Sequence, residues 1–169
     1  MQPFNHNGSF IRPPAVRERA FTLVELILVL SILGILSAVI IPKIGGRFED
    51  VRVDLLTDRM HAELEYVRQY AITNHDTTWF VVNEAGNEYG IYVGPSAGTR
   101  VLLADPHTGT AAVVDIDSEY DGVSITASDF GGSDEVSFNW WGVPSSGGSI
   151  TLNGTRTLTL VAETGTIYE

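Results

Sequence analysis

Alternating carboxylates in the second half of the chain are the first residues whose spacing suggests chemistry. The run Asp-Ile-Asp-Ser-Glu-Tyr-Asp-Gly places Asp115, Asp117 and Asp121 where they could supply the oxygen ligands that Ca²⁺ prefers. A complete EF-hand loop, however, needs glycine and a bidentate glutamate at the positions that Tyr120 and Thr126 occupy here. We therefore favour a solvated acidic turn, and the alternative is a weak calcium site at the three aspartates.

No other group of side chains stands at the spacing of a catalytic or metal-binding motif. The four histidines fit no zinc pattern, and the sequence has no phosphate-binding glycine loop or Ser-His-Asp arrangement. The Gly- and Ser-rich loop 142–148 lacks the spacing of a nucleophile elbow and predicts a turn. Trp140 and Trp141 before it have two interpretations, part core and part hairpin, or a contact with another subunit. We expect a protein that is not an enzyme and that needs no cofactor.

One further carboxylate lies in an unusual place. Phe21–Ile41 is a run of twenty-one predominantly apolar residues in which Glu25 is the only charge. As a helix this run spans about 32 Å, enough to cross the roughly 30 Å hydrocarbon core of a bilayer. An ionisable residue inside such a span is costly, so we expect Glu25 to be functional. The alternative is a glutamate that snorkels to the membrane surface near the start of the helix.

The elements that position these residues begin with a helix. Pro42 ends or kinks its apolar first stretch. Beyond it a helical period continues through apolar residues at Leu56, Met60, Leu64, Val67 and Ala71. Between them lie charged residues that predict a solvated face, namely Asp58, Arg59, Glu63, Glu65 and Arg68. We predict one long helix from about Phe21 to Thr73, which the polar run 74–76 ends.

From Thr77 onward short β-rich runs replace the helical period. Trp79–Val82 and Tyr89–Val93 flank the turn 84–87 and predict a hairpin. The further candidate strands are Arg100–Leu103, Ala111–Ile116, Val123–Ala127, Glu135–Asn139, Ser149–Leu152, Arg156–Val161 and Thr166–Tyr168. The sequence therefore predicts an α+β fold, with a long N-terminal helix and an antiparallel all-β head of about seven to nine short strands.

The composition and the net charge of the chain exclude several classes of site and partner. The 169 residues leave room for one domain besides the apolar span, and the absence of cysteine excludes disulfides and thiolate metal sites. The net charge of −11 lies in the second part of the chain, since residues 69–169 contain thirteen acidic and two basic side chains. Such a surface repels nucleic acid and anionic lipid, so we expect no nucleic-acid partner.

The start of the apolar run carries a resemblance to a known family. A short basic stretch ends at Ala20, and Phe21-Thr22-Leu23-Val24-Glu25 then opens the run. This segment resembles the processing motif of type IV pilins and type II secretion pseudopilins. The resemblance implies that a prepilin peptidase cleaves between Ala20 and Phe21 and methylates the new Phe21 amine. Ala20 stands where the family usually has glycine.

The resemblance also implies a domain organisation and a location. It divides the chain into a leader (1–20), a transmembrane and filament-core helix (21–41), an amphipathic continuation (42–76) and a β-sheet head (77–169), in the lollipop arrangement of pilins. The chain would cross the bacterial inner membrane once, with its leader cytoplasmic and its head periplasmic. Its partners would be the peptidase, other major and minor pseudopilins and the inner-membrane assembly platform. In the assembled pseudopilus, the Phe21 amine would lie level with the glutamate of a neighbouring helix that corresponds to Glu25, so that this pairing neutralises both charges.

The tail narrows the family further. Val136-Ser137-Phe138, the Gly-Pro-Ser-rich turn 142–148 and the final strand pattern resemble the GspH/FimT group. This resemblance implies a minor pseudopilin near the tip of a type II secretion pseudopilus, which drives protein export across the outer membrane. The alternative is a FimT-like minor pilin of a type IV pilus, used in adhesion, motility or DNA uptake. FimT-like pilins that bind DNA do so through basic C-terminal residues, and residues 163–169 contain none.

Overall fold

The computed structural model describes residues 22–111 and 113–169, apart from the side chains of residues 38–47. These residues form two compact units, divided between Ile41 and Pro42. The long helix α1 (Leu23–Asn74) contributes to both units. The prediction of one long helix is therefore confirmed, and α1 does not end at Pro42. The kink predicted there stays a prediction.

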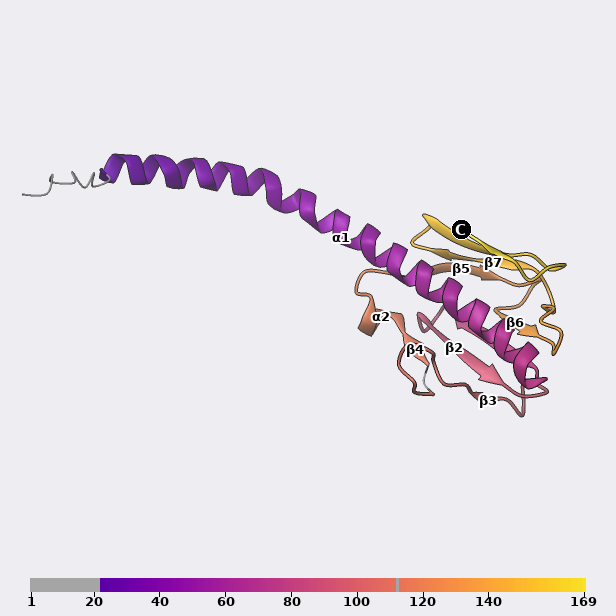
Figure 1. Ribbon diagram of the computed structural model, residues 1–169. Helices are drawn as coiled ribbons and strands as arrows, with labels where there is room; N and C mark the ends of the chain where they lie inside the picture. Colours follow the sequence, from indigo (N-terminus) through magenta and orange to yellow (C-terminus); the bar gives the residue numbers. More distant parts are fainter. Residues whose placement is uncertain (1–21, 112) are drawn as a thin grey trace, which may run out of the picture. The chain divides into compact units, whose positions relative to one another are not determined.

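In the second unit, α1 packs an apolar stripe against the rest of the chain. The buried residues of this stripe follow each other at helical spacing, at Val53, Leu56, Met60, Leu64, Val67 and Ala71. They share one core cluster with side chains from both β-sheets, and Figure 1 shows this half of α1 lying against the strands. The helix ends where His75 adopts a left-handed backbone conformation, with φ of 55°. The sequence had predicted both the stripe and this stop.

Two antiparallel sheets form the head. The first contains β1 (Thr78–Asn83), β2 (Glu88–Val93), β3 (Val101–Leu102), β4 (Val114–Asp115) and β6 (Glu135–Phe138), in the order β3-β2-β1-β6 with β4 also paired to β2. The second contains β5 (Ile125–Asp129), β7 (Gly148–Leu152), β8 (Arg156–Leu160) and β9 (Ile167–Tyr168), in the order β5-β7-β8-β9. The predicted hairpin is present, since β1 pairs with β2 in a register that sets Asn83 opposite Glu88.

The strand predicted over Ala111–Ile116 is wrong in most of its length. Of its residues that the structure describes, only Val114–Asp115 pairs as β4, and a short helix follows it, α2 (Ile116–Glu119). Asp115 caps this helix, because its Oδ1 atom accepts a hydrogen bond from the Ser118 amide at 3.3 Å. An aspartate followed three residues later by serine is thus a helix start here, and the alternation of apolar and acidic residues concealed it.

Candidate functional site

The first turn of α1 holds Glu25 through the backbone. The Glu25 amide donates to Thr22 Oγ1 at 3.2 Å, and the Leu26 amide donates to the Thr22 carbonyl at 3.1 Å. Thr22 is therefore the N-cap, and Glu25 stands three residues later, as in a capping box. This role of Thr22 was not predicted, although the pattern Thr-x-x-Glu is visible in the sequence. Within the described residues, Glu25 has no ion pair.

The surface of α1 around Glu25 is apolar, and among the described residues of its unit nothing covers it. Large apolar side chains from Leu23 to Leu36 are all exposed, with Leu23 at 74% and Ile35 at 68%. The hydroxyls of Ser31 and Ser37 donate to carbonyls one turn earlier, at 2.8 and 2.7 Å, so the helix satisfies its own polar side chains. A continuous apolar surface of this kind indicates contact with lipid or with other helices.

Part of the predicted processing and membrane segment lies outside the described residues. Ala20 and Phe21 both lie outside the described residues, so cleavage between them and methylation of Phe21 stay predictions. Among the helical residues that the structure does describe, no segment is long and apolar enough to cross a membrane. The single membrane crossing predicted over Phe21–Ile41 likewise stays a prediction.

The three aspartates of the candidate calcium site each have a different protein partner. Asp115 caps α2, Asp117 accepts a hydrogen bond from Asn87 Nδ2 at 2.6 Å, and Asp121 forms an exposed ion pair with Arg52 at 3.4 Å. Across residues 22–111 and 113–169, no three acidic or imidazole side chains are grouped so that they could hold a metal ion. The structure therefore does not bring the three aspartates together, and a weak calcium site stays a prediction.

The tryptophan pair lies outside the core. Trp140 is 46% and Trp141 67% exposed, in the connection between β6 and β7. Their ring centroids are 4.0 Å apart, and the Trp140 ring also lies 6.0 Å from that of His75, which follows α1. The interpretation of these residues as part of the core is therefore wrong. A subunit contact at this place stays a prediction.

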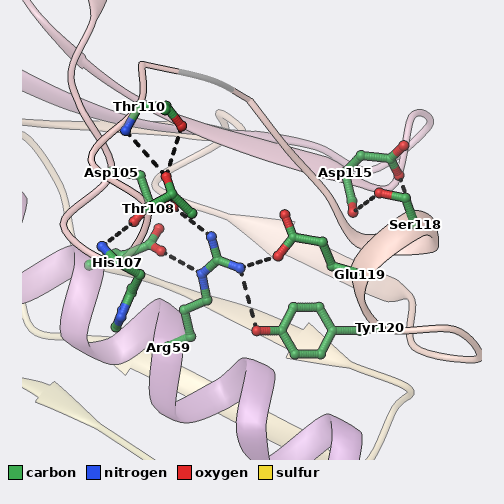
Figure 2. A network of polar contacts seen from close by, with 10 residues as sticks. Arg59, Asp105, His107, Thr108, Thr110, Asp115, Ser118, Glu119 and Tyr120 are labelled. Carbon is green, nitrogen blue, oxygen red and sulfur yellow. Dashed lines mark hydrogen bonds and ion pairs between the residues drawn. The ribbon is translucent and has the colours of Figure 1, made fainter.

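A buried ionic cluster in the head was not foreseen. The sequence placed Arg59 and Glu63 on a solvated face, but their side chains are only 10% and 0% exposed. The Arg59 guanidinium donates to Glu63 Oε1 and to Asp105 Oδ2, each at 2.7 Å, and it also contacts Glu119 and Tyr120. Figure 2 shows these groups converging on Arg59 from the turn after β3 and from the end of α2. One cation on α1 thus joins the turn after β3 and the end of α2 to this helix.

Asp105 organises the turn that covers Arg59. Its Oδ1 atom accepts from the His107 amide at 2.7 Å, and its Oδ2 atom accepts from Thr108 Oγ1 at 3.2 Å (Figure 2). Burial acts to raise the pKa of Asp105, but the His107 amide and the Arg59 charge outweigh it and hold the pKa below its usual value. For Glu63 the balance is reversed: burial raises the pKa of this carboxyl against the effect of Arg59. The two carboxyls on one arginine therefore differ in their affinity for protons.

Comparisons with known proteins agree with the fold and with the N-terminal motif. Residues 16–41 match the prokaryotic N-terminal methylation motif, and residues 56–165 match the family of the type II transport protein GspH. The type IV wide pilus major component PilA4 of Thermus thermophilus is 26% identical over 110 residues, a match that covers 54% of this chain and 84% of that protein.

A solved structure extends the comparison to the fold. The minor pseudopilin EpsH from the type 2 secretion system of Vibrio cholerae is similar, with a TM-score of 0.54. This match covers 69% of the present chain and 94% of the EpsH chain at 9% identity, and it supports a pilin-like fold. Both resemblances noted in the sequence, to pilins and to the GspH group, are confirmed. Because the second family match spans well over half of the chain, the protein belongs to the family of the type II transport protein GspH.

Proposed function

We propose that this chain is a minor pseudopilin of a type II secretion system, a structural subunit without catalytic activity that enters a periplasmic pseudopilus near its tip. The observation that carries this proposal is the GspH match over residues 56–165. It is supported by the similarity of the fold to EpsH and by the methylation motif over residues 16–41.

Processing and location follow from the same motif. A prepilin peptidase removes residues 1–20 and methylates the Phe21 amine, and the remaining helix anchors the head on the periplasmic side of the inner membrane. The uncovered apolar surface of α1 faces lipid before assembly and the helices of other pseudopilins afterwards. The assembly platform of the inner membrane is the further partner of this step.

In this proposal, Glu25 sets how neighbouring helices are aligned along their axes. Cleavage before Phe21 creates a positive amine near an apolar helix surface that carries one carboxylate. When helices pack together and exclude water, an unpaired charge becomes strongly unfavourable. Pairing of Glu25 with the Phe21 amine, in either direction between neighbouring subunits, neutralises both charges only when the helices are correctly aligned along their axes.

A minor pilin of a type IV pilus is the second candidate, and the similarity to PilA4 favours it. Deletion of the gene in its host separates the two functions. For a pseudopilin, we expect secreted proteins to accumulate in the periplasm while surface pili and pilus-dependent motility are unchanged. Full secretion together with loss of pili, motility or DNA uptake would instead support the pilus function. Complementation with the intact gene controls for effects on neighbouring genes.

A further inference from the structure

The two tryptophans after β6 form the centre of an exposed apolar patch beside the end of α1. The tryptophan patch is defined here as Ile72, Trp140, Trp141 and Val143, and the first and last of these are 41% and 43% exposed. Ile72 meets the turn directly, because its Cδ1 atom lies 2.6 Å from the place that a Cβ atom on Gly142 would take. Large apolar side chains that gather on the surface of a folded domain indicate contact with another molecule.

The turn that carries the tryptophans is fastened by hydrogen bonds. Asn139 Oδ1 accepts from the amides of Trp141 and Val143, at 3.0 and 3.1 Å, and the Gly142 amide donates to the Asn139 carbonyl at 2.7 Å. Arg68 Nε, on α1, donates to the Gly142 carbonyl at 3.2 Å. The tryptophans are thus displayed on a preorganised surface, which lowers the entropic cost of binding a partner.

The arrangement of the rings leaves one indole face for a partner. The Trp140 ring is stacked against Trp141 at an interplanar angle of 32°, and the His75 ring lies edge-on to Trp140 at 68°. Trp140 therefore supports Trp141, whose ring is the more exposed of the two. Among the described side chains, no arginine lies over either ring. The face of an indole attracts cations, above all a guanidinium or ammonium group.

The head contains a complete example of such a contact. The Arg100 guanidinium carbon lies 5.1 Å from the ring centroid of Trp79 and 5.0 Å from that of Tyr92. The same guanidinium donates to Glu135 Oε2 at 2.8 Å. Aromatic rings and a carboxylate thus hold one arginine inside the head. The tryptophan patch presents aromatic rings in the same way, but no described side chain of this protein supplies the cation.

The charges around the patch favour a cationic partner. Asp76 lies just beyond the end of α1, and Glu163 precedes Thr164, whose carbonyl accepts from Arg68 at 3.3 Å. Both carboxylates are exposed, and neither forms an ion pair within the described part of the chain. Arg68 itself is already paired with Glu65. A basic partner therefore gains from the rings and from the carboxylates, whereas an acidic partner is repelled.

We propose that the tryptophan patch is the docking site for an arginine- or lysine-containing segment of another protein. The cationic side chain of this segment stacks on Trp141, and Asp76 and Glu163 flank it. The site belongs to the head, so it is distinct from the helix contacts proposed for α1 and for Glu25. It depends on the geometry of the head alone, and a test on purified protein is therefore independent of which filament the chain enters.

Titration of the full-length protein with a short arginine peptide tests the proposal. The chain has three tryptophans, so protein labelled with nitrogen-15 in tryptophan gives three indole signals. The probe is the peptide Gly-Arg-Gly-Arg-Gly, and its matched control contains citrulline, which keeps the shape of arginine without the charge. In a neutral detergent without sugar groups, we expect the arginine peptide to shift the signals of Trp140 and Trp141. The Trp79 signal should not move, because Arg100 already covers that ring.

Variants separate stacking on the indole from general attraction between opposite charges. Trp141→Leu, at an exposed position that the fold does not need, should weaken binding by about fivefold. Asp76→Asn combined with Glu163→Gln should weaken it by about threefold. Asp50→Asn combined with Asp58→Asn removes the same charge from exposed positions of α1 and should leave binding unchanged at physiological salt.

Several results would overturn the proposal. Equal binding of the citrulline peptide would show that the patch does not select a cation, and an equal loss in the two pairs of charge variants would show attraction without a site. Unchanged binding by Trp141→Leu, or no shift at about 5 mM peptide, would exclude stacking on the indole. Shifts of Trp140 and Trp141 caused by cellohexaose but not by the arginine peptide would assign the patch to a carbohydrate instead.

Discussion

At the scale of single residues, Glu25 has two separable properties. Its amide takes part in the cap that Thr22 gives α1, and its position in the first turn suits the helix dipole. Its side-chain charge lies in an apolar surface, where it serves no interaction among the described residues. The first property concerns the helix alone, whereas the second concerns a neighbouring subunit. A substitution that keeps one and removes the other distinguishes them.

Glu25→Gln is that substitution, since glutamine also completes a capping box but carries no charge. We expect Glu25→Gln and Glu25→Ala to be equally defective in crosslinking to neighbouring pseudopilins and in secretion, because both remove the charge. Both should insert and be cleaved normally, because the span becomes more apolar. Immunoblots for processing, crosslinking yield and secreted activity measure these outcomes. A functional Glu25→Gln beside a defective Glu25→Ala would assign the residue to helix capping alone.

Asp105 illustrates the opposite case, a carboxylate whose charge stabilises the fold. Asp105→Asn removes one of the two buried counterions of Arg59 and leaves Glu63 as the other, so we expect a loss of about 2 kcal/mol in the free energy of unfolding near neutral pH. Because the folded pKa of Asp105 is lowered, this advantage of the wild type is present above 3.8 and lost as pH falls through the folded pKa. Urea unfolding at several pH values measures it. Asp121→Asn, whose side chain is 91% exposed, should change stability by less than about 0.5 kcal/mol.

At the scale of elements, Asn87 connects the β1–β2 hairpin to the second sheet. Its Nδ2 atom donates to the Val123 carbonyl at 2.9 Å, and its Oδ1 atom accepts from the amide of Ile125, the first residue of β5, at 2.9 Å. Its φ of 47° is a left-handed conformation that asparagine tolerates better than most residues. The hairpin turn therefore does more than reverse the chain, since its last residue also fixes the neighbouring strand.

Substitution of Asn87 should separate these two contributions. We expect Asn87→Ala to lower the free energy of unfolding by about 3 kcal/mol, because it leaves buried backbone groups unpaired and strains a residue at positive φ. Asn87→Gly loses the same side-chain hydrogen bonds but adopts positive φ without strain, so it should still cost about 2 kcal/mol. Urea unfolding followed by tryptophan fluorescence gives both values. A glycine variant as stable as the wild type would mean that the side-chain bonds contribute nothing.

The elements that could be predicted from sequence are those with a regular period. Leu56, Met60 and Leu64 gave the buried face of α1 because a helix repeats every three to four residues. The β1–β2 hairpin followed from two β-rich runs on either side of a turn. The Thr-x-x-Glu cap of α1 was readable in the same way, although it was missed. These features depend on residues that are close in sequence.

The burial of Arg59 and Glu63 could not be predicted in that way. Both lie between apolar positions of α1, where charged residues normally face solvent. What covers them is Asp105, forty-six residues later than Arg59, and the end of α2, sixty residues later. A single sequence carries no signal for contacts of such separation. The cluster is therefore a consequence of how the turn after β3 folds back over the helix.

At the scale of the whole molecule, charge is the property that separates the two proposed functions. Arg100 and Arg156 are the only basic side chains after residue 68, and both already pair with carboxylates, Arg100 with Glu135 at 2.8 Å and Arg156 with Asp54 at 2.6 Å. Removal of the leader would make the chain more acidic still, because the leader carries three arginines and one glutamate. A minor pilin for DNA uptake needs free cations in its head, and the described residues offer few.

We therefore expect the full-length protein in detergent to show no shift of duplex DNA in a gel at physiological salt. Binding to DNA gains most of its free energy when cationic side chains displace counterions from phosphates, and this head is strongly acidic. A variant with Glu163→Lys and Glu169→Lys, which makes the tail basic, serves as the matched control and should bind more strongly at low salt. Micromolar binding by the wild type that weakens steeply with added salt would contradict the prediction and would favour the minor pilin over the pseudopilin. If only the variant with the basic tail binds DNA, then the charge of the tail, rather than the fold that pseudopilins and minor pilins share, decides whether a head of this kind binds DNA.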